Sequence, residues 1–337
     1  MYDEECLLLI IARTQIMLRV IGFQKRNLAR VISQRTYAPP LGRSFAVATK
    51  GVTVETNLKT ETNRLEKTLQ KFWEKITVEN DGAEISVKMD GKCLRTPLGN
   101  EIILPKSKPI LAELIALEWR NLPNLSIKPH QVPLTSITAR AIDLKLANNA
   151  DAEGKAKIGN RQHISEELLR YLDTDTLLIF SPADEFEGAL RAEQDKLYKP
   201  LMSEVEELLT SLHPEKEEIK LSFLDCEVHG IRSNKQSEAT KIAAQKFMDS
   251  LDVYSFVAFE KAVMSSKSFI CGMYTVMLLR EADGQMRLEL DNIIRASNLE
   301  TIYQTERWGE VEDTHDVDKE DIKRNLTSAV LLAHGST

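Results

Sequence analysis

Apolar and polar residues alternate in the segment that follows residue 75, and this period of two predicts β-strands. The alternation is clearest over residues 76–78 and 85–89. Asn, Asp and Gly at 80–82 separate the two runs, and these residue types tolerate the positive φ of hairpin turns. A further turn at 96–100 precedes an apolar run at 101–104. The pattern predicts a small antiparallel sheet.

Beyond the sheet, apolar positions recur with the period of a helix. Leu111, Leu114, Ile115 and Leu117 predict a helix over about 109–121 that covers the sheet, with Pro109 in its first turn. Repeated prolines then interrupt the chain, and we place a domain boundary near residue 128.

The rest of the chain predicts a mainly helical domain with a few short strands. Thr135 is expected to cap its first helix, and Ser181-Pro182 to open a long helix that Pro200 kinks or splits. Strands are expected at 175–180 and 219–224. Further helices are expected at about 135–146, 165–172, 236–250, 253–280, 287–307 and 318–333. The predicted fold class is therefore α+β, with a β-rich domain at 65–128 and a larger helical domain at 129–337.

The first fifty residues differ in composition from the rest. No Asp or Glu lies between Cys6 and Val54, and the helical pattern that begins at Met17 is basic and amphipathic. Such a segment is typical of a mitochondrial transit peptide. Because Arg35-Thr36-Tyr37 resembles a processing site, we expect a transit peptide at 1–37 and a flexible linker at 38–64. A basic surface helix that is retained is the alternative, and Met17 is a possible initiator.

The net charge of −7 conceals an asymmetry between this leader and the body. Residues 1–50 hold eight Lys/Arg and three acids, a net charge of +5, which leaves −12 for residues 51–337. A body this acidic repels phosphate backbones, so nucleic acid is excluded as a partner. No run of 18 apolar residues is present, so we expect no membrane insertion.

Motifs for catalysis or metal binding are missing from the sequence. Gly154 and Gly159 have P-loop spacing, but Asn160-Arg161 stand where Lys and Ser/Thr belong. The six histidines are scattered, and the four cysteines form no CxxC pair. We expect no enzyme activity, no metal and no cofactor. A matrix enzyme with a pocket between the two domains is the alternative, and it would need convergent titratable groups.

One polar stripe is unusual for a helix surface. Glu300, Gln304 and Trp308 are spaced i, i+4, i+8 and precede Gly309, while Glu312 lies in the acidic run that follows. Trp supplies apolar area with one donor, and Glu and Gln supply directed hydrogen bonds, which suits protein recognition. We predict a partner-binding surface at Glu300, Gln304, Trp308 and Glu312. A polar face that ends in a core Trp with a Gly cap is the alternative.

Short motifs in a fixed order carry a family resemblance over about 60–330. They are Lys71-Phe-Trp-Glu-Lys75, Met89-Asp-Gly-Lys92, Arg95-Thr-Pro-Leu-Gly99, Glu118-Trp119, Pro133-Leu-Thr135, Ala141-Ile-Asp143, Arg170-Tyr-Leu-Asp-Thr-Asp-Thr-Leu177, Lys267-Ser-Phe-Ile270 and the Glu300 stripe. Taken together, they resemble the assembly-factor family that chaperones the alpha subunit of the mitochondrial ATP synthase F(1) sector. Tyr198 departs from the Trp of many members.

The resemblance implies a β-rich part followed by a helical part, and Glu300 as the position most closely tied to function. It implies transient binding of the unassembled alpha subunit. With the predicted transit peptide, we therefore expect an ATP-independent chaperone of the mitochondrial matrix that prevents aggregation of that subunit and promotes F(1) assembly. We expect a monomer without cofactor. A structural subunit that stays in the finished complex is a further alternative.

Overall fold

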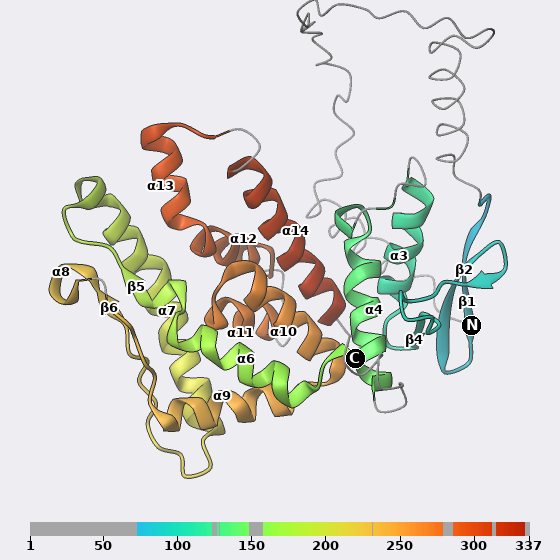
Figure 1. Cartoon of the computed structure of the whole chain (residues 1–337), viewed down its shortest axis with the longest axis horizontal. Helices are drawn as coiled ribbons and strands as arrows, with labels where there is room; N and C mark the ends of the chain where they lie inside the picture. The colour runs from blue at the N-terminus through green and yellow to red at the C-terminus, as the bar shows by residue number, and fades with distance from the viewer. Residues whose placement is uncertain are drawn as a thin grey trace, which may run out of the picture. The chain divides into compact units, whose positions relative to one another are not determined.

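The computed structural model describes residues 73–122, 127, 129–147, 158–230, 232–278, 286–311 and 315–333, which belong to one compact unit. The predicted transit peptide and linker lie outside the described residues, as does Glu312. The α+β fold class is confirmed, because a small antiparallel sheet precedes a series of helices (Figure 1). The boundary near residue 128 stays a prediction.

The sheet is built on a hairpin, as the alternation predicts. Strands β1 (Ile76–Asp81) and β2 (Glu84–Met89) are antiparallel, with Ile76 opposite Met89 and Asp81 opposite Glu84. The turn therefore lies at Gly82 and Ala83, and φ of +65° at Gly82 favours glycine there. Strands β3 (Lys92–Cys93) and β4 (Ile103–Pro105) both pair with β2.

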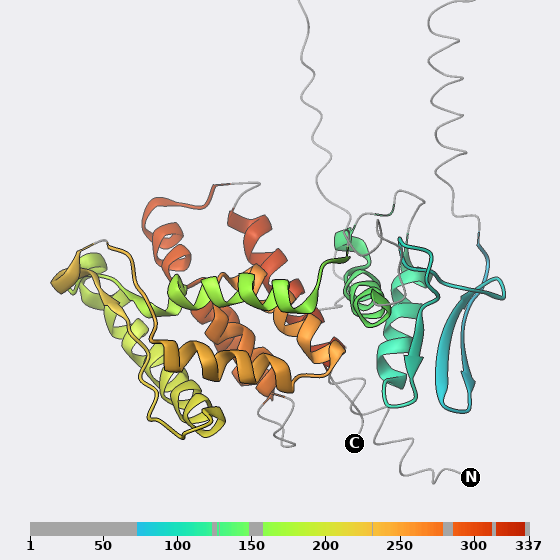
Figure 2. The ribbon, with the colours of Figure 1, turned by 60° about the horizontal axis from the view of Figure 1, so that its bottom comes forward.

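Helix α3 (Pro109–Asn121) covers this sheet, as predicted. Leu111 and Ile115 of α3 are buried, as are Ile85 and Val87 of β2. Helix α4 (Pro133–Leu146) packs on α3, so α3 lies between the sheet and α4 (Figure 2). The buried carboxylate of Asp143 accepts hydrogen bonds from Thr96 Oγ1 at 2.7 Å and Asn100 Nδ2 at 2.8 Å, which links α4 to the loop before β4.

The start of α4 differs from the sequence prediction. Thr135 is not the cap but a buried residue within the helix, and the N-cap residue Val132 has no polar side chain to offer. Glu118 of α3 takes that role: its carboxylate accepts from Leu134 N at 2.8 Å, Thr135 N at 2.9 Å and Thr135 Oγ1 at 2.7 Å. A side chain from another helix thus satisfies free N–H groups of α4.

Helices dominate the remainder of the described chain, and a parallel strand pair joins β5 (Ile179–Phe180) to β6 (Leu224–Asp225). The helices are η1 (Pro129–Gln131), α6 (Arg161–Asp173), η3 (Thr176–Leu178), η4 (Glu185–Gly188), α7 (Ala189–Leu212), α8 (Cys226–His229), α9 (Glu238–Ser250), α10 (Val253–Ser266), α11 (Phe269–Met277), α12 (Met286–Ser297), α13 (Leu299–Trp308) and α14 (His315–Ala333). Among the described residues, no helix is long and apolar enough to cross a membrane.

Several predicted element bounds were wrong. The helix expected at 253–280 breaks at Lys267, where φ is +58°, and Ser268 caps α11 by accepting from Cys271 N at 3.0 Å. The helix expected at 287–307 breaks at Asn298. Pro200 lies within α7 without splitting it, and the strands expected at 175–180 and 219–224 shrink to two residues each.

The helical core is centred on α10, which packs against α4, α6, α11 and α14. Its residues Phe256, Phe259 and Val263 are buried. At Gly272 of α11 the helices approach so closely that an added β-carbon would lie 2.3 Å from Val263 Cγ2 and 2.9 Å from Phe259 Cε2. Glycine at this position therefore sets the distance between α10 and α11.

Gly272→Ala should lower the free energy of unfolding by about 1–3 kcal/mol, because the new methyl overlaps side chains of a packed core. Chemical denaturation at constant pH measures the loss. In the double variant Gly272→Ala/Val263→Ala the nearest clashing methyl is gone, so the combined loss should be smaller than the sum of the single losses. Strict additivity would show that the contact does not limit packing.

Burial raises the pKa of Glu118 from 4.5 to about 7, against the opposing effect of its three hydrogen bonds. The folded chain then holds this proton to a higher pH than the unfolded chain. The stabilising effect of the protonated group is therefore lost as pH rises from about 4.5 to about 7. Subtracting the unfolding free energy of Glu118→Gln from that of the unchanged chain should leave a difference that falls over this window. Parallel pH profiles for the two proteins would contradict the assignment.

Candidate functional site

The predicted partner-binding residues fall on α13, a helix with sharp ends. Leu299 at its start is buried, which fixes the helix against the core. At the other end Gly309 has φ of +90°, and its N–H donates to Thr305 O at 2.9 Å. A glycine in this conformation ends a helix at low cost. Trp308 is therefore the last helical residue and lies at the C-terminal end of α13.

The three described members of the stripe lie on one side of α13. Gln304 Nε2 donates to Glu300 Oε1 at 2.8 Å, so the amide and the carboxylate hold each other in place. Glu300 is exposed, Gln304 is half-buried, and Trp308 is 68% exposed. The alternative of a core Trp is excluded by this exposure. We call the surface formed by the side chains of Glu300, Gln304 and Trp308 the α13 surface.

Trp308 is exposed to solvent on one side and supported on the other. Its ring lies 5.5 Å from the ring of Phe186, centroid to centroid. Phe186 also contacts Tyr303 of α13 edge-on at 5.7 Å, and the Arg307 guanidinium lies 5.4 Å from its ring centre. Because Phe186 is buried, it forms a fixed platform that limits the rotamers of Trp308.

The backbone that presents Phe186 is in an unusual conformation. Phe186 (φ 50°, ψ 40°), Glu187 (φ 55°, ψ 29°) and Gly188 (φ 82°) are successive left-handed residues in η4. For residues with a β-carbon this conformation costs about 1–2 kcal/mol each. The sequence prediction of a helix opening at Ser181-Pro182 is therefore wrong, since α7 begins only at Ala189. Burial of the Phe186 ring against α13 offsets the strain.

A polar cluster fastens α13 to the neighbouring helices. Tyr303 Oη donates to Glu193 Oε2 of α7 at 2.7 Å, and Arg295 Nε of α12 donates to Glu193 Oε1 at 2.7 Å. The hydrogen bond from Arg295 holds the pKa of Glu193 below its usual range, against the effect of burial. The three groups join three helices and fasten α13 to α7 and α12.

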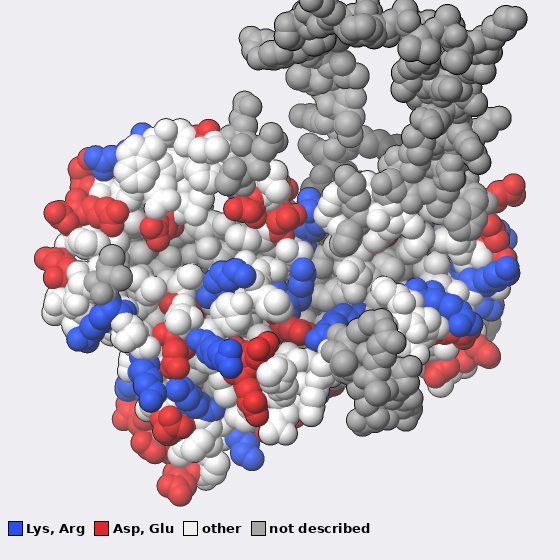
Figure 3. All heavy atoms as spheres, in the orientation of Figure 1, with Lys and Arg blue, Asp and Glu red and all other residues white. Residues whose placement is uncertain are grey.

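The surroundings of the α13 surface are acidic. Glu306 and Glu310 are exposed on or just after α13, and Glu187 is paired only loosely with Arg307 at 3.7 Å. Burial raises the pKa of the Cys226 thiol in α8, and nearby carboxylates add to the rise, Glu300 among them. Figure 3 shows uncharged surface over α13, with carboxylates along its lower edge and basic side chains at its upper left edge. An apolar centre with an acidic border is the result.

Sequence reasoning missed Phe186, the residue that orients Trp308. It lies in Asp184-Glu-Phe-Glu-Gly188, an isolated aromatic among acids and followed by glycine, which is the one local signal of a turn that holds a ring. For metal binding, the described residues contain no cluster of three or more His, Cys, Asp and Glu side chains.

Comparisons with known proteins identify the fold and the family. The crystal structure of Atp12 from Paracoccus denitrificans has a TM-score of 0.57 and 22% identity, covering 80% of this chain and 99% of that one. The structure of a mutant form of the same bacterial protein also gives a TM-score of 0.57, covering 78% of this chain and 96% of that one. This protein thus has the α+β fold of the Atp12 chaperones.

Two relatives found by sequence are more similar to this chain in sequence than these bacterial structures are. The family model described as ATP12 chaperone protein matches residues 70–206. Protein ATP12, mitochondrial, of Saccharomyces cerevisiae is 48% identical, covering 83% of this chain and 89% of the relative; the Schizosaccharomyces pombe protein is 35% identical, covering 78% and 82%. The chain belongs to the ATP12 family of ATP synthase assembly chaperones, which confirms the resemblance found from its motifs.

Phe186→Ala should free the Trp308 ring, because its platform is removed. With 5-fluorotryptophan incorporated, the ¹⁹F resonance of Trp308 should shift toward that of the free amino acid, while those of Trp73 and Trp119 stay in place. Phe223→Ala is the control, since Phe223 packs on Phe180 at 5.3 Å. A Trp308 resonance that is unchanged in Phe186→Ala would contradict the platform.

Proposed function

We propose that this chain is an ATP-independent chaperone of the mitochondrial matrix that binds the unassembled alpha subunit of ATP synthase. It prevents aggregation of that subunit, promotes assembly of the F(1) sector, acts as a monomer and catalyses no reaction. Membership of the ATP12 chaperone family and the mitochondrial names of its relatives support the proposal.

The observation that carries the proposal is the exposure of Trp308 on a rigid support. A tryptophan that is 68% exposed is a large apolar group in water, and such groups are frequent at the energetic centre of protein interfaces. Its ring is held by Phe186, so less side-chain entropy is lost on binding. The hydrogen-bonded pair of Glu300 and Gln304 adds directed polar contacts beside it.

The chemistry required of such a chaperone is reversible covering of apolar surface. An unassembled alpha subunit exposes the surface that it later buries against its neighbours, and exposed apolar interfaces aggregate. A small contact centred on one aromatic group binds strongly enough to delay aggregation. The larger interface of the assembled complex then displaces it by mass action, so no ATP is needed.

The alternative of an enzyme with a pocket between the two domains finds less support. A pocket of about 500 Å³ among the described residues is lined by side chains from residues 130–328, all within the predicted helical domain. Its Arg140 and Arg324 are paired with carboxylates. Among the described residues, no cluster of three or more His, Cys, Asp and Glu side chains could hold a catalytic metal.

Glu300→Lys should abolish binding of the alpha subunit and leave the fold intact, because the charge reversal falls on an exposed side chain at the N-terminal end of the α13 surface. Binding is measured by co-purification of the tagged chain with newly imported alpha subunit, with and without ATP. Light scattering of the isolated alpha subunit measures aggregation. The amount of co-purified alpha subunit should fall to the background level, a loss of about ten-fold or more.

Glu215→Lys is the matched control, since Glu215 is also exposed but lies beyond the end of α7, outside the α13 surface. Trp308→Ala should weaken binding in the same assays. A folded Glu300→Lys protein that binds the alpha subunit normally would remove Glu300 from the site. If the unchanged chain fails to keep the alpha subunit in solution, the chaperone role itself is wrong.

A further inference from the structure

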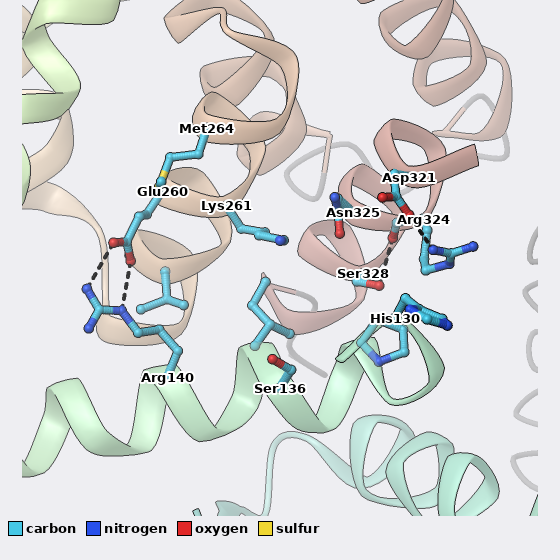
Figure 4. A pocket seen from close by; sticks show the side chains of 13 residues that line it. His130, Ser136, Arg140, Glu260, Lys261, Met264, Asp321, Arg324, Asn325 and Ser328 are labelled. Atoms are coloured by element: carbon cyan, nitrogen blue, oxygen red, sulfur yellow. Dashed lines mark hydrogen bonds and ion pairs between the residues drawn. The ribbon is translucent and has the colours of Figure 1, made fainter. Parts of the chain in front are cut away.

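A second site lies away from the α13 surface, between α4, α10 and α14. It is a pocket of about 500 Å³, within the range of small-molecule sites. Pro133 and Ile137 of α4, Val257 and Met264 of α10 form its apolar wall. Figure 4 shows polar side chains from all three helices pointing into the same space. None of the residues that form the α13 surface lines this pocket.

Two ion pairs flank the pocket. On one side Arg140 of α4 binds Glu260 of α10 through Nη2–Oε1 at 2.9 Å and Nε–Oε2 at 3.3 Å, and it also donates to Ile158 O. On the opposite side Arg324 pairs with Asp321 within α14 (Figure 4). Both guanidinium groups therefore already have a carboxylate.

Lys261 lies between the two pairs and differs from them. Its side chain reaches from α10 across the pocket toward α14 (Figure 4), and its ammonium group forms no hydrogen bond or ion pair with a described residue. Burial lowers the pKa of Lys261, with an opposing effect from Asp321 and Glu260. A half-buried cation without a bonded partner is costly, and a bound anion would relieve that cost.

Neutral polar groups also line the pocket and remain available for a ligand. Ser136 of α4, Asn325 of α14 and His130 of η1 line the pocket, and their side chains form no hydrogen bond with described residues. A hydroxyl and an amide beside an ammonium are donors that suit oxygen acceptors. Within the part of the chain that the structure describes, the pocket thus combines an unpaired ammonium group, neutral donors and an apolar wall.

The charge of the pocket selects the ligand class. Its three cations, Arg140, Lys261 and Arg324, face two carboxylates, Glu260 and Asp321, which leaves a net charge of +1 with His130 neutral. A monoanion neutralises this charge, whereas a phosphate dianion would exceed it and meet the two carboxylates. The apolar wall fits the carbon chain of an organic acid.

We propose that the pocket between α4, α10 and α14 binds a monocarboxylate, with Lys261 paired to the carboxylate and the apolar wall against the attached carbon chain. The inference does not rest on the alpha-subunit partner. The carboxylate has two possible sources, a free organic acid or an acidic side chain of a bound protein.

Hexanoate is the probe, and the ¹³C methyl resonance of Met264 is the reporter, because Met264 lines the pocket and is half exposed. Titration of the full chain should shift this resonance to saturation. Hexanamide has the same length without the charge, and it should bind about ten-fold or more weakly. Inorganic phosphate should cause no shift. Equal binding of hexanoate and hexanamide would reduce the site to an apolar cleft and overturn the proposal.

Lys261→Gln should weaken hexanoate binding by about ten-fold or more, and Lys261→Arg should restore most of it. Lys246→Gln is the matched control, since Lys246 is exposed on α9 away from the pocket. The other methionine methyl resonances report whether each variant folds. Unchanged hexanoate affinity in folded Lys261→Gln would overturn the assignment.

A competition experiment separates the two sources. If saturating alpha subunit displaces hexanoate from the Met264 site, the carboxylate belongs to the partner protein. If hexanoate and the alpha subunit bind together, the ligand is a free organic acid. Either result supports a carboxylate site, and the titrations above test the site whether or not the alpha subunit is the partner.

Discussion

Helices in this protein end inside the fold, and buried side chains from distant segments satisfy their free backbone groups. Glu118 of α3 accepts from the N-terminus of α4. Asp175 accepts from Leu177 N and from Ile270 N at the start of α11, each at 2.9 Å. Lys108 Nζ donates to Leu332 O at 2.8 Å and Ala333 O at 3.3 Å at the end of α14. Since unpaired buried N–H and C=O groups are costly, these contacts fix where helices stop and which elements adjoin.

The contact from Lys108 ties the segment before α3 to the C-terminal helix. Both proposed sites depend on that arrangement, because α14 supplies one wall of the pocket between α4, α10 and α14, and α11 leads through α12 to α13.

The sequence predicts the elements better than their ends, and the capping mechanism explains why. Alternation at 76–89 gave the hairpin, and the apolar period at 109–121 gave α3 with its observed bounds. Thr135 looked like a cap because the true acceptor, Glu118, is 17 residues away and on another helix. The break at Lys267 was missed because a lysine with positive φ has no distinctive sequence signal, unlike glycine. For the site, spacing placed Glu300, Gln304 and Trp308 together, but Phe186 becomes their neighbour only through tertiary packing.

The backbone strain in η4 and the exposure of Trp308 arise from the same arrangement of residues. Two non-glycine residues in left-handed conformation place the Phe186 ring under α13. The free energy gained by burying that ring offsets the strain of the backbone. The cluster of Glu193, Arg295 and Tyr303 then fastens α13 to α7 and α12 with Trp308 exposed. A flexible helix would fold its tryptophan onto the nearest apolar surface. Exposure of Trp308 is therefore maintained by the rigidity of its surroundings, and a group kept exposed at a cost in stability is more readily explained by binding than by folding.

If the α13 surface binds a partner as proposed, its acidic border would make that binding selective. A bare apolar patch would bind any exposed apolar surface, including another copy of this chain. Carboxylates such as Glu306 and Glu310 beside Trp308 repel one another between copies and favour a partner with basic residues around its apolar centre. Because these charges are exposed, they would act mainly on the rate of encounter and on the choice of partner in the proposed complex, while the aromatic centre would contribute the affinity. In this proposal the carboxylates select the partner by repulsion, and the small apolar contact holds it. Both are compatible with transient binding, since neither creates an interface large enough to resist displacement of the chaperone.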